Sequence, residues 1–314
     1  MSTQAQIDAL AEGLGEVASN ANVLWLLVIT FLMVSMQAGF ALREVGTVQR
    51  KNTTDILYKY LFNGAVTAIA WWILAFGFAN GNTKGGFIGV SQYGLDSNAF
   101  KFGKDNGGPF FQLYFWDWAF ALTAVTVAGG ALGERVKIQT ALIASIAIAI
   151  WIYPIIAHWC WGQGWLSPFA NQQYDFLFYG KDSNNYIDCA GSGVVHTVGG
   201  VCALVGAIAL GARKGRFDSN TTLKKNSMPL VAVGTLVLWV GFYGYNVGSY
   251  GNIIGDGAGI SGKIAALTTL CAAFSACTIL AIQMITNDFD ITVLANGLVA
   301  GLVAVGAGVE VIEM

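Results

Sequence analysis

Five polar residues fall inside or at the ends of long apolar segments: Asp117, Asp188, His196, Asn246 and Ser249. An ionisable group at membrane depth is costly, so such a residue is a functional hypothesis by default. Aromatic residues flank them, namely Trp116, Phe120, Trp159, Trp161, Tyr243 and Tyr245. Aromatic faces with one carboxylate and one hydroxyl can hold a small cation by cation–π attraction. An aromatic belt at a membrane–water boundary has the same spacing, so this pattern alone leaves both interpretations open.

The composition indicates a membrane protein. Of 314 residues, 55% are hydrophobic and 11% are charged, and the mean hydropathy is +0.59. An ordinary soluble domain has about 25% charged residues. A soluble enzyme, a disordered chain and a nucleic-acid binder are therefore excluded, and the net charge of −2 offers nucleic acid no electrostatic footprint. No nucleophile–base pair and no metal-ligand spacing is present, so we expect no enzyme activity, no metal and no cofactor.

Eight segments are long and apolar enough to predict transmembrane helices, which need about 20 such residues. They cover residues 23–42, 60–80, 110–132, 138–160, 189–211, 229–250, 262–285 and 291–309. The third has the weakest membrane signal, because it begins with a polar and aromatic stretch. No linker or change of composition divides the chain. We expect one membrane domain over residues 22–314, preceded by an extracellular N-terminal segment, residues 1–21.

The basic residues predict the orientation of these helices. The first, third and fifth loops hold ten of them: Arg43, Arg50, Lys51, Arg135, Lys137, Arg213, Lys214, Arg216, Lys224 and Lys225. The even-numbered loops hold five. By the positive-inside rule the odd loops are cytoplasmic and the N-terminus is outside. Two Asn-Thr-Thr sequons, at Asn52 and Asn220, then lie in the cytoplasm and stay unglycosylated; the alternative is the opposite topology.

Several motifs resemble those of ammonium transporters of the Amt/Mep/Rh superfamily. They are Gly39–Gly46 with Lys51–Thr53, Gly130–Arg135, Tyr153–Trp165, Asp188–His196 and Gly241–Ser249. Their order and spacing match from about residue 23 to the end of the chain. The stretches Thr83–Gly89 and Gly215–Asp218 are similar to the plant and algal Amt branch. The resemblance implies an all-α transporter for ammonium, embedded in a lipid bilayer, most often the plasma membrane, as a homotrimer.

The resemblance also assigns roles to residues of this chain. Trp161, Ser249 and Phe120 match an outer ammonium-recruitment site, and Asp188 matches the buried acid beside it. Phe120 and Tyr245 match a paired aromatic gate below that site. His196 matches the first of two pore histidines. A neutral imidazole there could accept a proton and pass it on.

The residues themselves also allow simpler roles. Asp188 could only cap the start of the fifth helix, where a carboxylate suits free N–H groups. His196 could be a packed, hydrogen-bonded side chain, and we expect His158 to be structural. If Asp188 and His196 share one helix, eight residues separate them by about 12 Å and about 80°. The acid would then lie near the outer mouth and the imidazole near the membrane midplane.

The chain departs from the family pattern. The family has about eleven helices, two inverted repeats of five and a final one, whereas this chain has eight, or 5 + 3. The part with the second pore histidine is missing, so we expect either a fragment of a longer chain or a degenerate homologue. Tyr245 replaces the usual Phe, and Asp117, beside Trp116 in the vestibule, replaces a neutral residue. Asp117 could strengthen cation attraction, hold a cation too tightly, or pair with a neighbouring chain.

These residues and the resemblance together favour ammonium transport. Ammonium is recruited at Trp161 and Ser249, crosses the Phe120/Tyr245 gate, loses a proton near Asp188, and is conducted past His196. Two alternatives remain open at this stage: a sensor that binds ammonium without transporting it, and a structural membrane subunit of a larger assembly that retains the fold.

Overall fold

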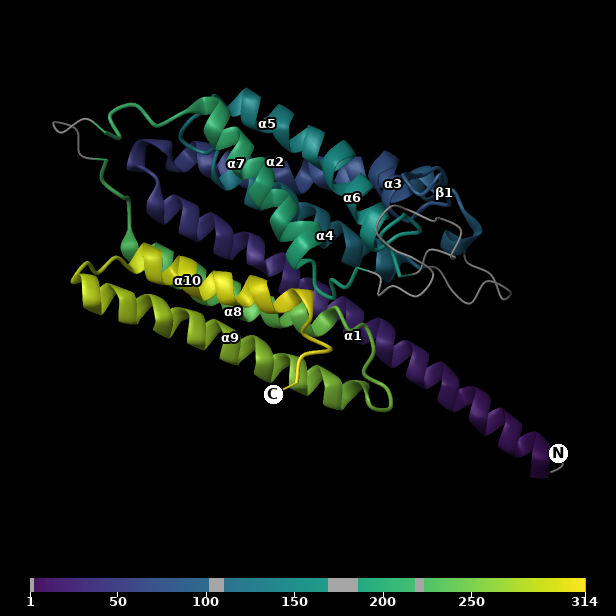
Figure 1. Cartoon of the computed structure of the whole chain (residues 1–314). Helices are drawn as coiled ribbons and strands as arrows, with labels where there is room; N and C mark the ends of the chain where they lie inside the picture. The colour runs from purple at the N-terminus through teal and green to yellow at the C-terminus, as the bar shows by residue number, and fades with distance from the viewer. Residues whose placement is uncertain (1–2, 102–109, 169–185, 218–222, 314) are drawn as a thin grey trace.

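The structure, a computed structural model, describes residues 3–101, 110–168, 186–217 and 223–313. Within these ranges it is all-α apart from one short antiparallel ladder, in which β1 (Thr83–Lys84) pairs with β2 (Ile88–Gly89). Figure 1 shows the helices running lengthwise beside one another in a single bundle. The predicted all-α membrane fold is confirmed.

Each of the eight predicted segments overlaps a described helix or a continuous pair of helices. These helices are α1 (Thr3–Thr47), α2 (Thr53–Ala70) continued by α3 (Phe76–Asn80), α4 (Phe111–Gly130), α5 (Ile138–Ala147) continued by α6 (Tyr153–Cys160), α7 (Val198–Leu210), α8 (Met228–Gly248), α9 (Gly257–Thr286) and α10 (Ile291–Ala304). By length and composition, six of the described helical segments could cross a membrane. The polar start of α4 and the shortness of Ile291–Ala307 keep these two outside that set.

Three of the long helices that the structure describes contain a π-helical turn. The turns are Trp71–Ala75 between α2 and α3, Ile148–Ile152 between α5 and α6, and Ser192–Thr197 at the start of α7. Such turns often mark functional positions, because they change the direction in which the following side chains point from the helix axis. The third one carries His196.

The first helix is much longer than its predicted span. It begins at Thr3, about 20 residues before the apolar run, and its 45 residues measure about 67 Å at 1.5 Å per residue. Residues 3–17 are exposed. Figure 1 shows this part of α1 extending beyond the other helices. Residues 3–21 of the predicted N-terminal segment are therefore helical and continuous with the first span; the extracellular location of that segment stays a prediction.

Close glycine contacts join α1 to α8. A Cβ atom on Gly39 would lie 2.8 Å from the carbonyl oxygen of Gly234, and one on Gly234 would lie 2.7 Å from that of Gly39. Further along, a Cβ on Gly244 would lie 2.7 Å from the carbonyl oxygen of Ile29. Small residues let helix backbones approach in lipid, where no hydrophobic driving force presses helices together. These two helices are the first of each predicted repeat; the inversion itself stays a prediction.

A buried ion pair joins α1, α2 and α4. Lys59, 2% exposed, contacts the carboxylate of Glu44 and donates a hydrogen bond to the carbonyl of Gly129 at 3.1 Å. Tyr60 donates to the other oxygen of Glu44 at 2.8 Å. A buried pair is tolerated when hydrogen bonds satisfy its remaining atoms, as here. No sequence pattern indicated this pair.

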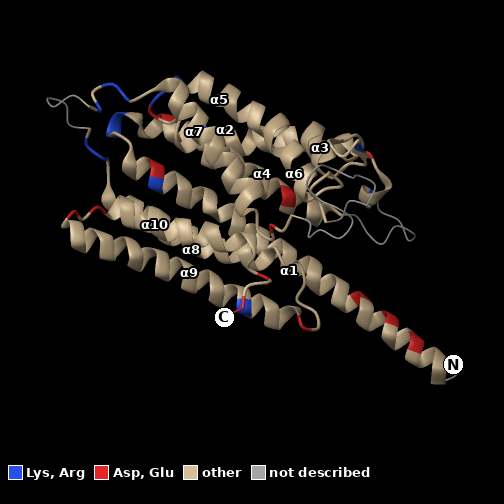
Figure 2. Ribbon diagram, in the orientation of Figure 1, with Lys and Arg blue, Asp and Glu red and all other residues tan. Residues whose placement is uncertain are grey.

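Glu134 ties together three of the odd-numbered loops. It accepts hydrogen bonds from the Gln49 backbone N–H at 2.7 Å and the Asn52 amide at 2.9 Å, and it pairs with Arg213. Burial favours a higher pKa for Glu134, but these hydrogen bonds and the guanidinium outweigh it and lower the pKa. Figure 2 shows Lys and Arg gathered near the start of α5 and the end of α7, opposite the N-terminus.

We expect Gly234→Ala to destabilise the protein. Its new methyl group would lie within 3 Å of the α1 backbone, and overpacking of this kind costs about 1–3 kcal/mol. Gly200→Ala on α7 is the matched control, because a Cβ there has nothing within 4 Å and gains the same helix propensity. Thermal unfolding in detergent compares them. Equal midpoints for the two variants would contradict the close-packed contact.

Candidate functional site

The ring of Phe120 on α4 lies at the centre of an aromatic cluster. Its centroid is 4.8 Å from that of Trp116, 5.1 Å from that of Trp161 at the end of α6, and 4.9 Å from that of Tyr245 on α8. All three contacts are edge-to-face, an arrangement that the ring quadrupoles favour. The family resemblance paired Phe120 with Tyr245. The two rings do meet, edge to face, at an interplanar angle of 76°.

The cluster continues to His196. The imidazole centroid is 5.2 Å from the Tyr245 ring and 5.6 Å from the Phe242 ring, on which it stacks at 25°. His196 is 8% exposed, and its Nε2 atom has no hydrogen-bond partner among the described residues. Ring contacts thus run without a break from Trp161 through Phe120 and Tyr245 to His196. We call these four residues the aromatic column.

Gly191 makes room for the column. Its φ of +73° is in the left-handed region that favours glycine. A Cβ atom here would lie 2.9 Å from the Trp161 ring and 3.1 Å from the Tyr245 hydroxyl. Any side chain would therefore strain the backbone and collide with two rings. Gly191 lies within the Asp188–His196 motif, but nothing in the sequence marked it as a residue of the site.

Asp188 lies before the helix that carries His196, not on it. The chain turns at Gly191 and the helix begins at Ser192, three residues later than predicted. The estimate of 12 Å and 80° along one helix is therefore wrong, because the helix rule does not apply across this turn. The Oδ2 atom of Asp188 accepts hydrogen bonds from the N–H groups of Gly193 at 2.9 Å and Val194 at 2.8 Å. The capping role of Asp188 is confirmed.

Two further contacts of Asp188 point to a second role. Its backbone carbonyl accepts a hydrogen bond from the indole N–H of Trp161 at 2.7 Å, which fixes the orientation of that ring. Its second carboxylate oxygen, Oδ1, is buried and has no partner in the part of the chain that the structure describes. The residue is 5% exposed. A carboxylate with one oxygen committed to the helix thus keeps the other available.

Ser249 belongs to the same end of the cluster. Its hydroxyl donates to the carbonyl of Tyr245 at 2.8 Å, so its oxygen remains free to accept a hydrogen bond. The preceding residue, Gly248, lies against Trp116, since a Cβ there would be 2.7 Å from that ring. Asn246, 1% exposed, instead donates to Thr268 and to the Leu302 carbonyl and joins α8 to α9 and α10.

The two remaining candidates have partners of their own. Asp117, next to Trp116 on α4, accepts a hydrogen bond from the Asn80 amide at 3.0 Å and so has a partner within its own chain. His158 is fully buried, with its ring nitrogens 2.9 Å from the Ala79 carbonyl and 3.0 Å from the Thr83 hydroxyl. This agrees with the structural role predicted for His158. Among the described residues, no group of three His, Cys, Asp or Glu side chains could hold a metal ion.

Long apolar helices around a buried aromatic column define an integral membrane protein. The model of the Ammonium Transporter Family matches residues 24–314, and the chain belongs to that family. The resemblance found in the sequence motifs is confirmed.

Two curated relatives show the extent of the similarity. The chain is 34% identical to the ammonium transporter Amt2 of Archaeoglobus fulgidus, over 91% of this chain and 59% of that protein. It is 32% identical to ammonium transporter 1 member 3 of Solanum lycopersicum, over 95% of this chain and 64% of that protein. The chain thus spans roughly three-fifths of the length of these relatives.

Solved structures share the fold. A structure described as a sensor Amt protein superimposes with a TM-score of 0.80 at 26% identity, over 95% of this chain and 71% of that one. Mep2 of Saccharomyces cerevisiae gives a TM-score of 0.75 at 23% identity, over 92% of this chain and 61% of that one, which shows the common fold alone.

Proposed function

We propose that the protein conducts ammonium across a membrane by recruiting the ion at one end of the aromatic column and removing its proton before the apolar interior. The observation that carries this proposal is the unbroken series of ring contacts from Trp161 to His196, with Asp188 hydrogen-bonded to Trp161 at the start. Family membership supports the choice of ammonium as the substrate.

Recruitment uses Trp161, Phe120, Ser249 and Asp188. Ammonium donates a hydrogen bond to the Ser249 oxygen and lies against the rings of Trp161 and Phe120. A desolvated cation over an aromatic face gains about 2 kcal/mol or more. The buried carboxylate of Asp188 adds a negative charge at this end. A second acid, Asp117, lies beside Trp116 and strengthens the attraction of the vestibule for cations.

The gate separates recruitment from conduction. Phe120 and Tyr245, with centroids 4.9 Å apart, leave no room for a hydrated ion unless the rings move. A bare ammonium ion in an apolar segment is too costly, so the unpartnered Oδ1 of Asp188 accepts the proton and neutral ammonia passes the rings. The proton is relayed separately from Asp188 to the unpartnered Nε2 of His196, which accepts it and passes it on. Each ammonium ion then yields one ammonia molecule and one proton, and the net transfer carries current.

The family and the charge distribution support three further proposals. The protein forms a homotrimer, it lies in the plasma membrane, and its N-terminus is outside. The basic end of the bundle in Figure 2 then faces the cytoplasm.

The orientation predicts which loops an impermeant thiol reagent can reach. A cysteine replacing Lys214, in the fifth loop, should stay unlabelled in intact cells and react after permeabilisation. A cysteine replacing Lys84, in the second loop, should react in intact cells. The unsubstituted protein, with five native cysteines, sets the background. The opposite labelling pattern would show that the protein has the opposite orientation in the membrane.

Trp161→Leu should weaken the preference for ammonium over alkali cations. The substitution removes the cation–π face, worth about 2 kcal/mol when desolvated, which sets an upper bound of roughly 30-fold on the loss of selectivity. Trp72→Leu is the matched control, because Trp72 is 51% exposed on the outside of the bundle. Uptake from mixtures of ammonium and potassium measures the ratio. Unchanged selectivity in the Trp161 variant would show that Trp161 belongs only to an aromatic belt at the membrane–water boundary.

His196→Ala should abolish ammonium-driven current in proteoliposomes because no proton acceptor remains at the end of the column. Asp188→Asn keeps an oxygen that can cap the helix but loses the charge, so current should fall without unfolding; Asp188→Glu should be intermediate. Size-exclusion profiles and melting points control for folding. Full current through a correctly folded His196→Ala protein would refute the relay. Ammonium binding with no current in the unsubstituted protein would favour a sensor.

A further inference from the structure

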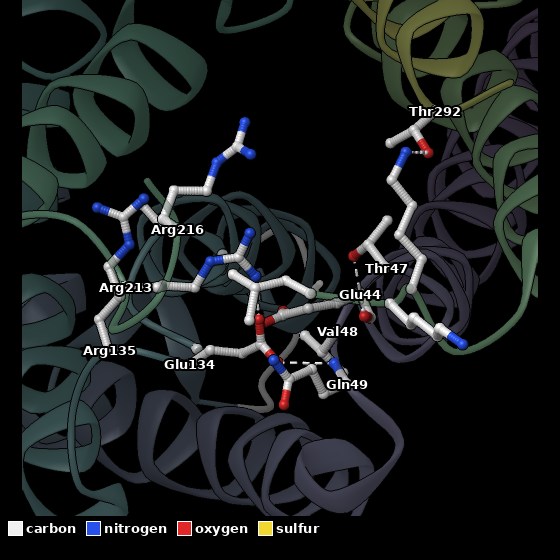
Figure 3. A pocket seen from close by; sticks show the side chains of 15 residues that line it. Glu44, Thr47, Val48, Gln49, Glu134, Arg135, Arg213, Arg216 and Thr292 are labelled. Atoms are coloured by element: carbon white, nitrogen blue, oxygen red, sulfur yellow. Dashed lines mark hydrogen bonds and ion pairs between the residues drawn. The ribbon is translucent and has the colours of Figure 1, made fainter. Parts of the chain in front are cut away.

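A cavity of about 350 Å³ opens at the basic end of the bundle, among the odd-numbered loops. Its walls come from the end of α1, the loop after α4, the segment after α7, residues 223–225 and the start of α10. Figure 3 shows Arg135, Arg213 and Arg216 on one side and Thr47 and Thr292 on the other. The volume is within the range of small-ligand sites. The proposed ammonium path uses none of these side chains.

Positive charge is in excess around this cavity. Five of its lining residues are cationic, namely Arg135, Arg213, Arg216, Lys224 and Lys225, and two are acidic, Glu44 and Glu134. Two of the five cations have carboxylate partners: Arg213 pairs with Glu134, and Lys225 pairs with Asp290 at 2.5 Å. The other three have no carboxylate partner among the residues that the structure describes.

The two acids do not neutralise this excess. Glu44 is already paired with Lys59 and hydrogen-bonded by Tyr60. Glu134 is held by Arg213, Gln49 and Asn52. Each negative charge therefore has its own cation, and the excess positive charge faces the cavity.

The C-terminal end of α7 holds the side chain of Arg135 in position. One of its guanidinium nitrogens donates to the carbonyls of Ala207 and Gly211, at the C-terminal end of α7, at distances of 3.5 and 3.1 Å. A cation suits the negative end of a helix dipole, so this contact stabilises the position of the side chain. The remaining guanidinium N–H groups are preorganised for a planar acceptor such as a phosphate.

We propose that this cavity binds a phosphate-bearing anion. Arg135 and Arg216 supply forked donors that match phosphate oxygens, and Lys224 adds a point charge. Three cations without carboxylate partners suit a group with up to two negative charges. The same excess would repel ammonium, so the cavity is no second entrance for the substrate. It lies at the ends of the helices, the level of the membrane surface, where a phospholipid headgroup and a free phosphate can both reach it.

Two binding measurements on the full chain distinguish a phospholipid headgroup from a free phosphate as the bound anion. In nanodiscs of neutral phosphatidylcholine, the protein is titrated with inorganic phosphate by calorimetry. In nanodiscs of phosphatidylcholine with phosphatidic acid, the lipid retained by the purified protein is quantified by mass spectrometry. The test variant is Arg216→Gln with Lys224→Gln, since neither side chain forms an ion pair in the described structure. The control is Lys84→Gln with Lys101→Gln, which removes the same charge at the opposite end.

Loss of two cations near a membrane surface should weaken binding about 30-fold in the test variant and leave the control unchanged. Retention of phosphatidic acid without phosphate binding identifies a lipid headgroup site, and phosphate binding identifies a free anion. The proposal is overturned if neither probe binds, or if the test variant binds as tightly as the unsubstituted protein. Neither measurement depends on transport, so the result is independent of the proposed function.

Discussion

The cost of placing charge in a low-dielectric interior governs this structure. An unpaired ion in lipid has lost its hydration without compensation, so each buried charge must be paired, hydrogen-bonded or neutralised. Glu44 and Lys59 satisfy this by pairing, with Gly129 and Tyr60 completing their hydrogen bonds. Under the proposed function, the same constraint acts on ammonium. A path lined by rings then suits ammonia rather than the ion, which is why the proposal assigns proton transfer to an acid at the entrance and an imidazole at the end.

The column depends on backbone geometry as much as on its side chains. The rings of Trp161 and Tyr245 pack against Gly191, a residue with positive φ and no space for a Cβ atom. Asp188 holds the start of the following helix through two N–H groups and orients Trp161 through its carbonyl. One short turn thus positions the Trp161 ring, the Tyr245 ring and the helix that carries His196. A glycine and a capping carboxylate therefore belong to the candidate site.

Much of the fold could be predicted from the sequence, because runs of apolar residues of membrane length have few alternatives. All eight segments form helices, and motif similarity brought Phe120, Trp161, Tyr245 and His196 together correctly. Features that depend on three-dimensional contacts escaped prediction. Hydropathy predicts that the first helix begins at residue 23, where the apolar run begins. The helix instead begins at Thr3, because polar residues are equally able to form a helix. The Glu44–Lys59 pair joins α1 and α2. No sequence pattern specified which faces of these two helices lie against each other.

Charge is segregated between the two ends of the bundle, and this gives each end a distinct affinity. At one end, Asp188 and the faces of Trp161 and Phe120 favour a small cation, since carboxylates and ring faces both attract positive charge. At the other end, Arg135, Arg216 and Lys224 surround a cavity in which the acids are already paired. A cation there would meet net repulsion, and an anion would meet preorganised donors. The two proposed sites therefore share no residue, and the length of the helices keeps their electrostatic fields apart.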